Sequence, residues 1–298
     1  MKSLKKIAMT LIAAICLVFV ACNNNQPEAK APVTVHVDGF SISQEDFPAA
    51  SQAPARAAAN PADYNDVNAI TLAFYKADGT ELYKHEQLKS DNTTFTTFGE
   101  FECSLPMGTH TMVVLAYFTN ENSVLTLTSP TEASFNVRVR ETFATTQTVT
   151  ISNTNAVDIS ATLSRVVSML TVKSSDGKTS DVTNVRMTFS AGGKDFNPTT
   201  GLAITTTGLT NTVGNSAAVG ATSTSSTMLF LNTDEQDIDV TIETLDANGN
   251  TLFSKTIENV PFKLNRITKL TGAMYTNTGI AGSFQVNTDW LSEQSVDF

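Results

Sequence analysis

One segment of this sequence begins like the zinc-binding helix of a metalloprotease. His85 and Glu86 open the pattern, but its fifth position is Lys89 instead of a second histidine, so two imidazoles cannot face one metal. The other histidines, His36 and His110, lie far apart in the chain, and each is expected on the surface of a strand. The sequence contains no nucleophile elbow, P-loop or dinucleotide fingerprint. We therefore predict no catalytic residue, no bound cofactor and no enzymatic activity.

Acidic side chains that could hold calcium gather in one segment of the second half. The segment "NTDEQDIDVT" contains Asp234, Glu235, Asp237 and Asp239. Hard cations need several converging oxygen ligands. However, Asp237 and Asp239 alternate with Ile238 and Val240, as expected for the polar face of a half-buried strand. The strand is the simpler interpretation, and no metal site is predicted.

A covalent modification is predicted at Cys22, near the N-terminus. Three lysines in the first six residues precede an apolar run from Ile7 to Val20, and Ala21 lies directly before Cys22. This order is typical of a cleaved signal peptide, residues 1–21, and the run is shorter than the roughly 20 residues of a membrane-spanning helix. The letters "FVAC" resemble a bacterial lipobox with Phe19 in place of the usual leucine. We expect a palmitate-bearing lipoprotein of the cell outer membrane; an ordinary signal peptide is the alternative.

Net charge and cysteine content limit the binding partners and the disulfides that the mature chain can have. The signal peptide carries three lysines, so its removal takes the formal net charge from −10 to −13. A surface this acidic repels phosphate backbones, and we predict no nucleic-acid partner. Of the three cysteines, Cys16 is expected to leave with the signal peptide and Cys22 is the predicted lipid site. Cys103 therefore cannot form an intrachain disulfide, and it is expected to be a small buried residue in a strand.

Alternation of apolar and polar residues recurs along the mature chain and predicts β-strands. The alternating apolar positions include Val33, Val35 and Val37, then Ile70, Leu72 and Phe74, and later Val185, Met187 and Phe189. Asp78-Gly79 and Asn248-Gly249 each separate two such runs, and pairs of this type favour tight hairpins. Helical spacing is nowhere sustained, so we predict an all-β protein built of β-sandwiches.

Changes in composition suggest how the chain is divided. Residues 22–32 are expected to form a flexible tether, and the first strand is expected from Val33 to Ile42. Residues 44–66 are rich in Ala, Pro and Asn and read as a linker after that strand. Residues 199–227 are dense in Thr, Ser, Gly and Ala and read as a long loop with weak strands. We predict an N-terminal domain over residues 33–155 and a C-terminal domain over residues 156–298.

Several segments together carry a resemblance to a known family. They are "VNAITLAFYKADGTELYK", "FECSLPMGTHTMVVLAYF", "VDISATLSRVVSMLTV" with Arg165, and "IENVPFKLNRITKLTGAMYT" with Asn265 and Arg266. In this order and spacing they resemble the fimbrillin-like lipoproteins of the Bacteroidales, which include fimbrial stalk, tip and anchor subunits. The resemblance implies two tandem transthyretin-like (Greek-key) β-sandwich domains and a role in cell adhesion.

The resemblance also implies assembly by exchange of β-strands between subunits. In that family a trypsin-like protease cuts after a basic residue in the linker, which releases the first strand and opens a groove for a neighbour's strand. The matching removable strand here contains Val33, Val35 and Val37, and Arg56 is the lysine or arginine that lies in the linker. Arg56 could equally be an ordinary solvent-exposed charge that no protease cuts. Anchor subunits need not be trimmed, so an anchor would keep its first strand.

The C-terminal block from Gly282 to Phe298 is the candidate donor strand, with Phe284 and Val286 on alternate positions. The expected partners are other fimbrial subunits and the outer membrane through the lipid on Cys22, with host or bacterial surface ligands or glycans as further candidates. The alternative function is a lipid-anchored carbohydrate-binding protein of a glycan-uptake system, with Trp290 or a loop aromatic as its platform.

Overall fold

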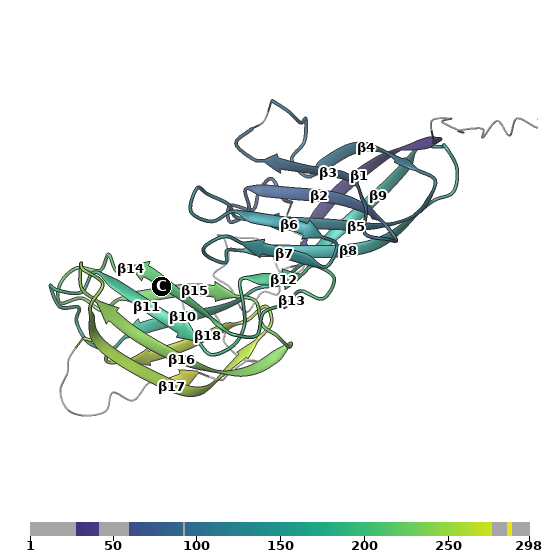
Figure 1. The fold of residues 1–298 in the computed structure, drawn as a ribbon. Coiled ribbons are helices and arrows are strands. Elements are labelled where there is room, and N and C mark those ends of the chain that lie inside the picture. The colour runs from purple at the N-terminus through teal and green to yellow at the C-terminus, as the bar shows by residue number, and fades with distance from the viewer. Residues whose placement is uncertain (1–27, 42–59, 92, 276–284, 288–298) are drawn as a thin grey trace, which may run out of the picture.

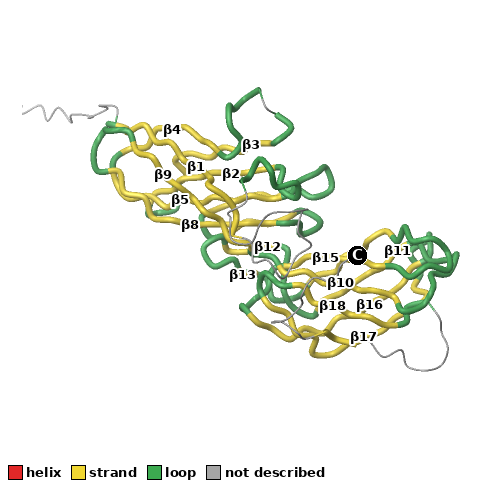
Figure 2. Tube along the Cα trace, turned by 180° about the vertical axis from the view of Figure 1, so that it is seen from behind, coloured by secondary structure: helices red, strands yellow, loops and turns green. Residues whose placement is uncertain are grey.

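The computed structural model describes residues 28–41, 60–91, 93–275 and 285–287. In this part of the chain the secondary structure consists of strands, turns and bends, so the predicted all-β fold is confirmed (Figure 2). Within the described ranges, no helix is long and apolar enough to cross a membrane. The predicted signal peptide, Cys22, Arg56, Phe284 and Trp290 lie outside the described residues.

Short strands follow one another along the described chain and are joined mostly by turns (Figure 1). The first nine are β1 (Lys30–Ser41), β2 (Ala69–Lys76), β3 (Glu81–Leu88), β4 (Glu100–Pro106), β5 (Gly108–Tyr117), β6 (Leu125–Ser129), β7 (Glu132–Phe135), β8 (Thr142–Ile151) and β9 (Val157–Arg165). The others described are β10 (Ser168–Ser174), β11 (Asn184–Phe189), β12 (Asp195–Asn197), β13 (Leu202–Ala203), β14 (Leu209–Gly214), β15 (Thr224–Leu229), β16 (Glu235–Leu245), β17 (Thr251–Lys263), β18 (Ile267–Gly272) and β19 (Gln285–Asn287).

A seven-stranded sheet organises the first half of the described chain, in the order β3-β2-β5-β8-β9-β1-β4. The predicted turn at Asp78-Gly79 joins β2 to β3, and Gly79 adopts φ +84°, a value that glycine reaches without strain. One face of this sheet covers a core that includes Ile70, Phe74 and Val114. The opposite face buries Tyr75 and other residues of β2 and β5 in a second cluster. Because both faces are covered, the apolar runs of β2 and β5 are buried without the alternation of a half-exposed strand.

The second half of the described chain forms a sandwich of two four-stranded sheets. One has the order β15-β10-β18-β19, and the other has the order β14-β11-β16-β17. Their inner faces enclose a third core, which includes Leu170, Met187 and Val240. The predicted hairpin at Asn248-Gly249 joins β16 to β17, and Gly249 has φ +84°. Asp237 and Asp239 are exposed on β16 whereas Ile238 and Val240 are buried, so the predicted alternation is confirmed.

A small sheet joins the two halves, in the order β13-β12-β7-β6 (Figures 1 and 2). Strands β6 and β7 come from the first half, and β12 and β13 come from the second. The ring of Phe230 stacks on Phe196 with centroids 4.2 Å apart and on Phe135 at 6.3 Å. These rings belong to the cluster that also buries Tyr75 of the seven-stranded sheet. The halves are therefore held together by backbone pairing and by a shared apolar core.

The predicted domain boundary at residue 155 lies just before a strand of the seven-stranded sheet. Strand β9 begins two residues after position 155 and pairs with β1 and β8 in the seven-stranded sheet. Residues 199–227 contain β13 and β14 and the beginning of β15. The boundary at 155 and the tandem Greek-key arrangement stay predictions.

Two single-residue predictions have different outcomes. His110 is 4% exposed, and its Nε2 lies 2.8 Å from the carbonyl oxygen of Pro106, so the expectation of a surface position was wrong for this histidine. The residue is on β5, whose two faces are both covered, and this double cover cannot be read from alternation. Cys103 is half-buried in β4 and packs against the first core, and burial raises the pKa of its thiol to about 11.

Candidate functional site

The predicted removable strand, β1, lies inside the seven-stranded sheet and not at its edge. It pairs antiparallel with β4 over seven residue pairs, from Lys30↔Pro106 to His36↔Glu100. On its other side it pairs parallel with β9, from Val33↔Val157 to Ser41↔Ser164. Among the described strands, β4 has no sheet partner other than β1, and β9 joins β8 through two residue pairs. Loss of β1 would therefore open a groove between β9 and β4.

The side chains of β1 form one wall of the first core. Val33, Val35 and Val37 are 1%, 0% and 7% exposed. A β-bulge between Val37 and Gly39 shifts the register by one residue, and so Phe40 also points inward and is fully buried. Sequence reasoning placed these residues on one strand, but the bulge that aims Phe40 into the core is a result of the tertiary structure.

The apolar burial along β1 is large for a single strand. Burying one Val or Phe side chain contributes about 1.5–3 kcal/mol, so the three valines and Phe40 contribute roughly 6–12 kcal/mol. The total stability of a typical domain is about 5–15 kcal/mol. The first half would therefore not stay folded without a strand in this position. Any segment that replaced β1 would have to bury a comparable apolar face.

Phe40 ends in an aromatic cluster that ties β1 to the chain beyond the predicted linker. Its ring stacks on Phe143 with centroids 4.5 Å apart and meets the edge of Tyr64 at 5.4 Å. Tyr64 lies in the last part of the region predicted as linker, residues 44–66, and its side chain is buried. The sequence gives one sign that Tyr64 is buried, namely that it is an aromatic residue next to an Ala- and Pro-rich stretch.

A buried ion pair covers the other face of this cluster. The guanidinium of Arg165 lies 5.0 Å above the ring of Phe143, and its Nε donates to Oε1 of Glu141 at 2.6 Å. The Arg165 and Glu141 side chains are 1% and 6% exposed. Nη2 of Arg165 also donates to the Tyr64 hydroxyl at 2.9 Å. The pair is enclosed and supported by further hydrogen bonds, which a buried ion pair needs to balance its loss of hydration.

Burial dominates the electrostatics of this network. It raises the pKa of the Glu141 carboxyl above its usual value, although the charge and hydrogen bonds of Arg165 act in the opposite direction. The pKa of the Tyr64 hydroxyl is also raised, first by burial and then by the charge of Glu141. Even beside Arg165, the net shift of both groups is a raised pKa, because burial outweighs the opposing effect of the guanidinium.

Arg165 also connects the first sheet to the second half of the chain. Its Nη1 donates to Oδ1 of Asn265 at 3.1 Å, in the turn between β17 and β18. Asn265 has φ +59°, and asparagine tolerates this left-handed conformation better than most residues. Its backbone N–H donates to the carbonyl of Val167 at 3.2 Å. Both Arg165 and Asn265 were singled out in the sequence, but nothing in their spacing showed that they meet.

The predicted donor segment is described over three residues. In β19, Gln285, Val286 and Asn287 pair antiparallel with Thr271, Leu270 and Lys269 of β18 at the edge of a sheet. Phe284, the other candidate donor residue, lies outside the described residues, as do Arg56 and Cys22. The structure therefore does not bring the candidate removable and donor strands together, and their roles stay predictions.

Other candidate chemistry from the sequence is not assembled. His85 is exposed on β3 and Lys89 follows that strand, so the zinc-protease pattern does not lie on a helix. In the described part of the chain, no three His, Cys, Asp or Glu residues converge on a possible metal position. Oε1 of Glu235 accepts a hydrogen bond from Lys263, and Oδ1 of Asp239 accepts one from the N–H of Asn259 at 2.8 Å.

Comparison with known proteins places the chain in a family. The chain belongs to a family described as a family of unknown function (DUF6562), whose model matches residues 33–297. No protein of curated function matches the sequence.

Solved structures share the fold at low sequence identity. A candidate adhesin from Bacteroides ovatus ATCC 8483 is 11% identical with a TM-score of 0.51, and the match covers 78% of this chain and 83% of that one. A second candidate adhesin from Bacteroides ovatus is also 11% identical at a TM-score of 0.51, with 92% and 98% covered. The fimbrial anchor protein Mfa2 from Porphyromonas gingivalis is 11% identical at 0.50, with 86% and 95% covered. The predicted resemblance to fimbrial and adhesin proteins of the Bacteroidales is confirmed at the level of the fold.

Proposed function

We propose that the chain is a non-enzymatic fimbrial subunit or fimbrial anchor that takes part in cell adhesion and assembles by β-strand donation. The observation that carries the proposal is the position of β1. This strand comes first in the described chain, yet it lies inside the sheet between β9 and the edge strand β4. A cut in the segment after it would leave it attached by non-covalent contacts alone. The fold shared with Mfa2 and with the candidate adhesins supports the same role.

The groove that β1 fills suits an incoming strand. Both neighbouring strands offer backbone partners over most of their length, and the floor accepts side chains at alternate positions. The C-terminal segment of another subunit, with Phe284 and Val286 at alternate positions, is the proposed donor, and donation would require β19 to leave its pairing with β18 of its own chain. In this scheme the buried β1 prevents early association, because the unpaired strands appear only after cleavage.

Limited tryptic digestion of the mature protein tests the scheme, with mass spectrometry and sizing of the products. We expect cleavage after Arg56 followed by ladders or filaments, and no assembly of an Arg56→Gln variant. An Arg56→Lys variant is the matched control, because trypsin still cuts there. A fluorescent peptide of residues 282–298 should bind the cut protein and not the uncut one, and a peptide with Phe284→Asp and Val286→Asp should not bind. Cleavage at Arg56 without assembly or peptide binding would refute strand donation and favour a permanently retained first strand.

The proposed attachment is a lipid on Cys22, which would hold the subunit at the outer membrane after removal of residues 1–21. Labelled palmitate should enter the wild-type protein and not a Cys22→Ser variant, which should appear in the soluble fraction. A Cys16→Ser variant is the control, because Cys16 would leave with the signal peptide. Equal labelling of the two variants would contradict lipidation at Cys22.

A further inference from the structure

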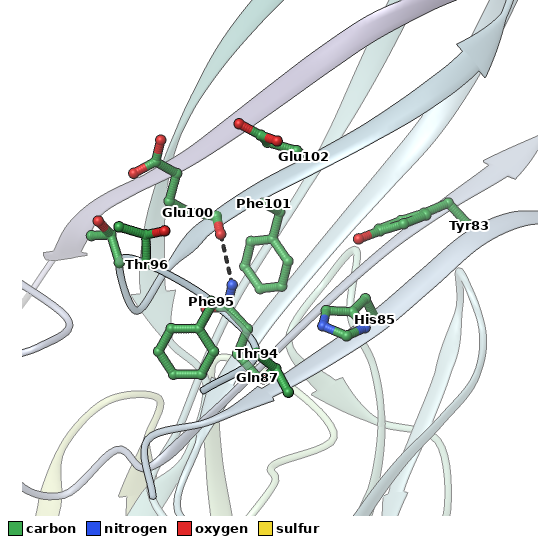
Figure 3. Close-up of a pocket in the computed structure, with 10 residues that line it drawn as sticks. Tyr83, His85, Gln87, Thr94, Phe95, Thr96, Glu100, Phe101 and Glu102 are labelled. Carbon is green, nitrogen blue, oxygen red and sulfur yellow. Dashed lines mark hydrogen bonds between the residues drawn. The ribbon is translucent and has the colours of Figure 1, made fainter. Parts of the chain in front are cut away.

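A hollow of about 380 Å³ opens on the first half of the molecule, between the two edges of the seven-stranded sheet. One wall comes from β3 and the other from β4, and the loop that joins these strands closes the end. Figure 3 shows four rings gathered around this hollow, from Tyr83, His85, Phe95 and Phe101. The volume lies within the range of about 300–1,000 Å³ that is usual for small-ligand sites.

The four rings differ in how far they are exposed to solvent. Phe101 is 2% exposed and belongs to the first core, and Tyr83 packs against the same core. The Phe101 and His85 rings form a T-shaped pair with centroids 6.2 Å apart, and the centroids of His85 and Tyr83 are 6.5 Å apart. His85 is exposed and Phe95 is half-exposed in the loop. Phe95 also packs against the first core, so a ligand in the hollow would reach His85 and the exposed parts of Phe95 and Tyr83.

The polar groups around the hollow are acceptors and neutral hydrogen-bonding groups. Glu100, Glu102 and the loop threonines Thr94, Thr96 and Thr97 complete the lining. In Figure 3 the carboxylates of Glu100 and Glu102 point away from the four rings. Among the residues that the structure describes, no lysine or arginine lines the hollow. An anionic ligand would bind near two negative charges without a counter-charge in the lining, whereas a neutral sugar can place its C–H face against the aromatic rings and its hydroxyls near the loop threonines.

One end of the hollow is closed to an added strand. Gln87 of β3, which is 2% exposed, closes one end: its Oε1 accepts from the N–H of Gly99 at 2.8 Å, and its Nε2 donates to the carbonyl oxygen of Glu100 at 2.6 Å. These bonds occupy the backbone edge of β4 at that end. An added strand could not continue past this point without breaking them, so a compact ligand fits the space better.

We propose that this hollow between β3 and β4 binds a neutral sugar unit of a glycan. The inference gives a ligand to the adhesive role proposed above, on which it rests for its biological meaning, but binding itself does not require strand exchange. It does require β1, because β4, which carries Phe101 and Glu102, is held in the sheet by β1. A subunit that loses β1 would therefore recover the site only when a donor strand takes its place.

The test uses the uncut mature protein on an array of immobilised neutral, sialylated and amino-sugar oligosaccharides, followed by calorimetry with the neutral oligosaccharide that gives the strongest signal. We expect binding to neutral glycans, weakened about five- to tenfold by His85→Ala and by Phe95→Ala, since one aromatic contact is worth about that factor. Phe253→Ala is the matched control, because Phe253 is a half-exposed phenylalanine on β17 and should leave affinity unchanged.

Three results would overturn the inference. The first is that neutral glycans bind no more strongly to the wild-type protein than to the His85→Ala/Phe95→Ala double variant. The second is a preference for sialylated or amino sugars. The third is glycan binding that the single variants leave unchanged. An extended peptide without aromatic residues that displaces the bound glycan would indicate strand addition at the edge formed by β3 and β4, and this result would count against a sugar site. Because the protein is not cut in this experiment, failure here leaves strand donation standing, and failure of the trypsin experiment leaves the sugar site standing.

Discussion

Replacing Arg165 by Met should destabilise the protein strongly, and the loss should depend on pH. The side chains of Arg165 and Glu141 are 1% and 6% exposed, so the substitution leaves a carboxylate buried without its counter-charge. Breaking a buried pair in this way costs about 3–5 kcal/mol. The Tyr64 hydroxyl also loses its donor from Arg165. We expect the free energy of unfolding to fall by that amount at pH 7.5, measured by urea denaturation of the mature chain.

The pH dependence follows from the direction of the pKa shift at Glu141. Burial already raises the folded-state pKa of this carboxyl, and removal of Arg165 removes two effects that lower it. A group with a raised folded pKa stabilises the fold below its unfolded pKa, and that contribution is lost as the pH rises through the folded value. The variant should therefore differ most from wild type at pH 7.5 and least near pH 4.5, around the ordinary pKa of a glutamate.

Two further variants separate this explanation from a simple loss of packing. Adding Glu141→Gln to Arg165→Met removes the uncompensated charge and should recover at least half of the lost stability at pH 7.5. Arg186→Met, which breaks the more exposed pair with Glu243 on the second half, should cost much less. A loss below about 1 kcal/mol that is independent of pH, with no recovery in the double variant, would refute the reasoning.

The remaining predictions concern the junction, the closed end of the hollow and the thiol. Phe230→Ala should cost about 3–5 kcal/mol in thermal or urea unfolding because it removes the ring between Phe196 and Phe135, whereas Phe253→Ala should cost clearly less; equal losses would contradict a shared core between the halves. Gln87→Leu should cost about 1–3 kcal/mol, since Gly99 N–H and the Glu100 carbonyl lose their partner, and faster hydrogen exchange at Gly99 would report it. Cys103 in a chain that begins at Asn23 should react slowly with iodoacetamide at pH 8 and faster towards pH 11, because burial raises its pKa to about 11; a native rate equal to that in denaturant would contradict this.

The amino-acid sequence by itself determined the class of fold and much of its local structure. Alternation at period two predicts β1 at Val33, Val35 and Val37, because side chains on a strand point to opposite faces in turn. Asp78-Gly79 predicts the β2–β3 hairpin, because a tight turn needs a residue that accepts positive φ. These signals depend on neighbours in the sequence, and they need no knowledge of distant segments.

Only the tertiary structure decided which strands are neighbours and which polar groups meet. Strand β1 lies beside β9, more than a hundred residues away, and this pairing makes it an interior strand. Tyr64, Glu141, Arg165 and Asn265 come from four separate segments, and Phe230 joins two halves that alternation treats as separate. Alternation records which face of a strand is apolar but not what covers it. The hollow between β3 and β4 likewise exists because the two edges of one curled sheet approach each other, a contact that no local pattern encodes.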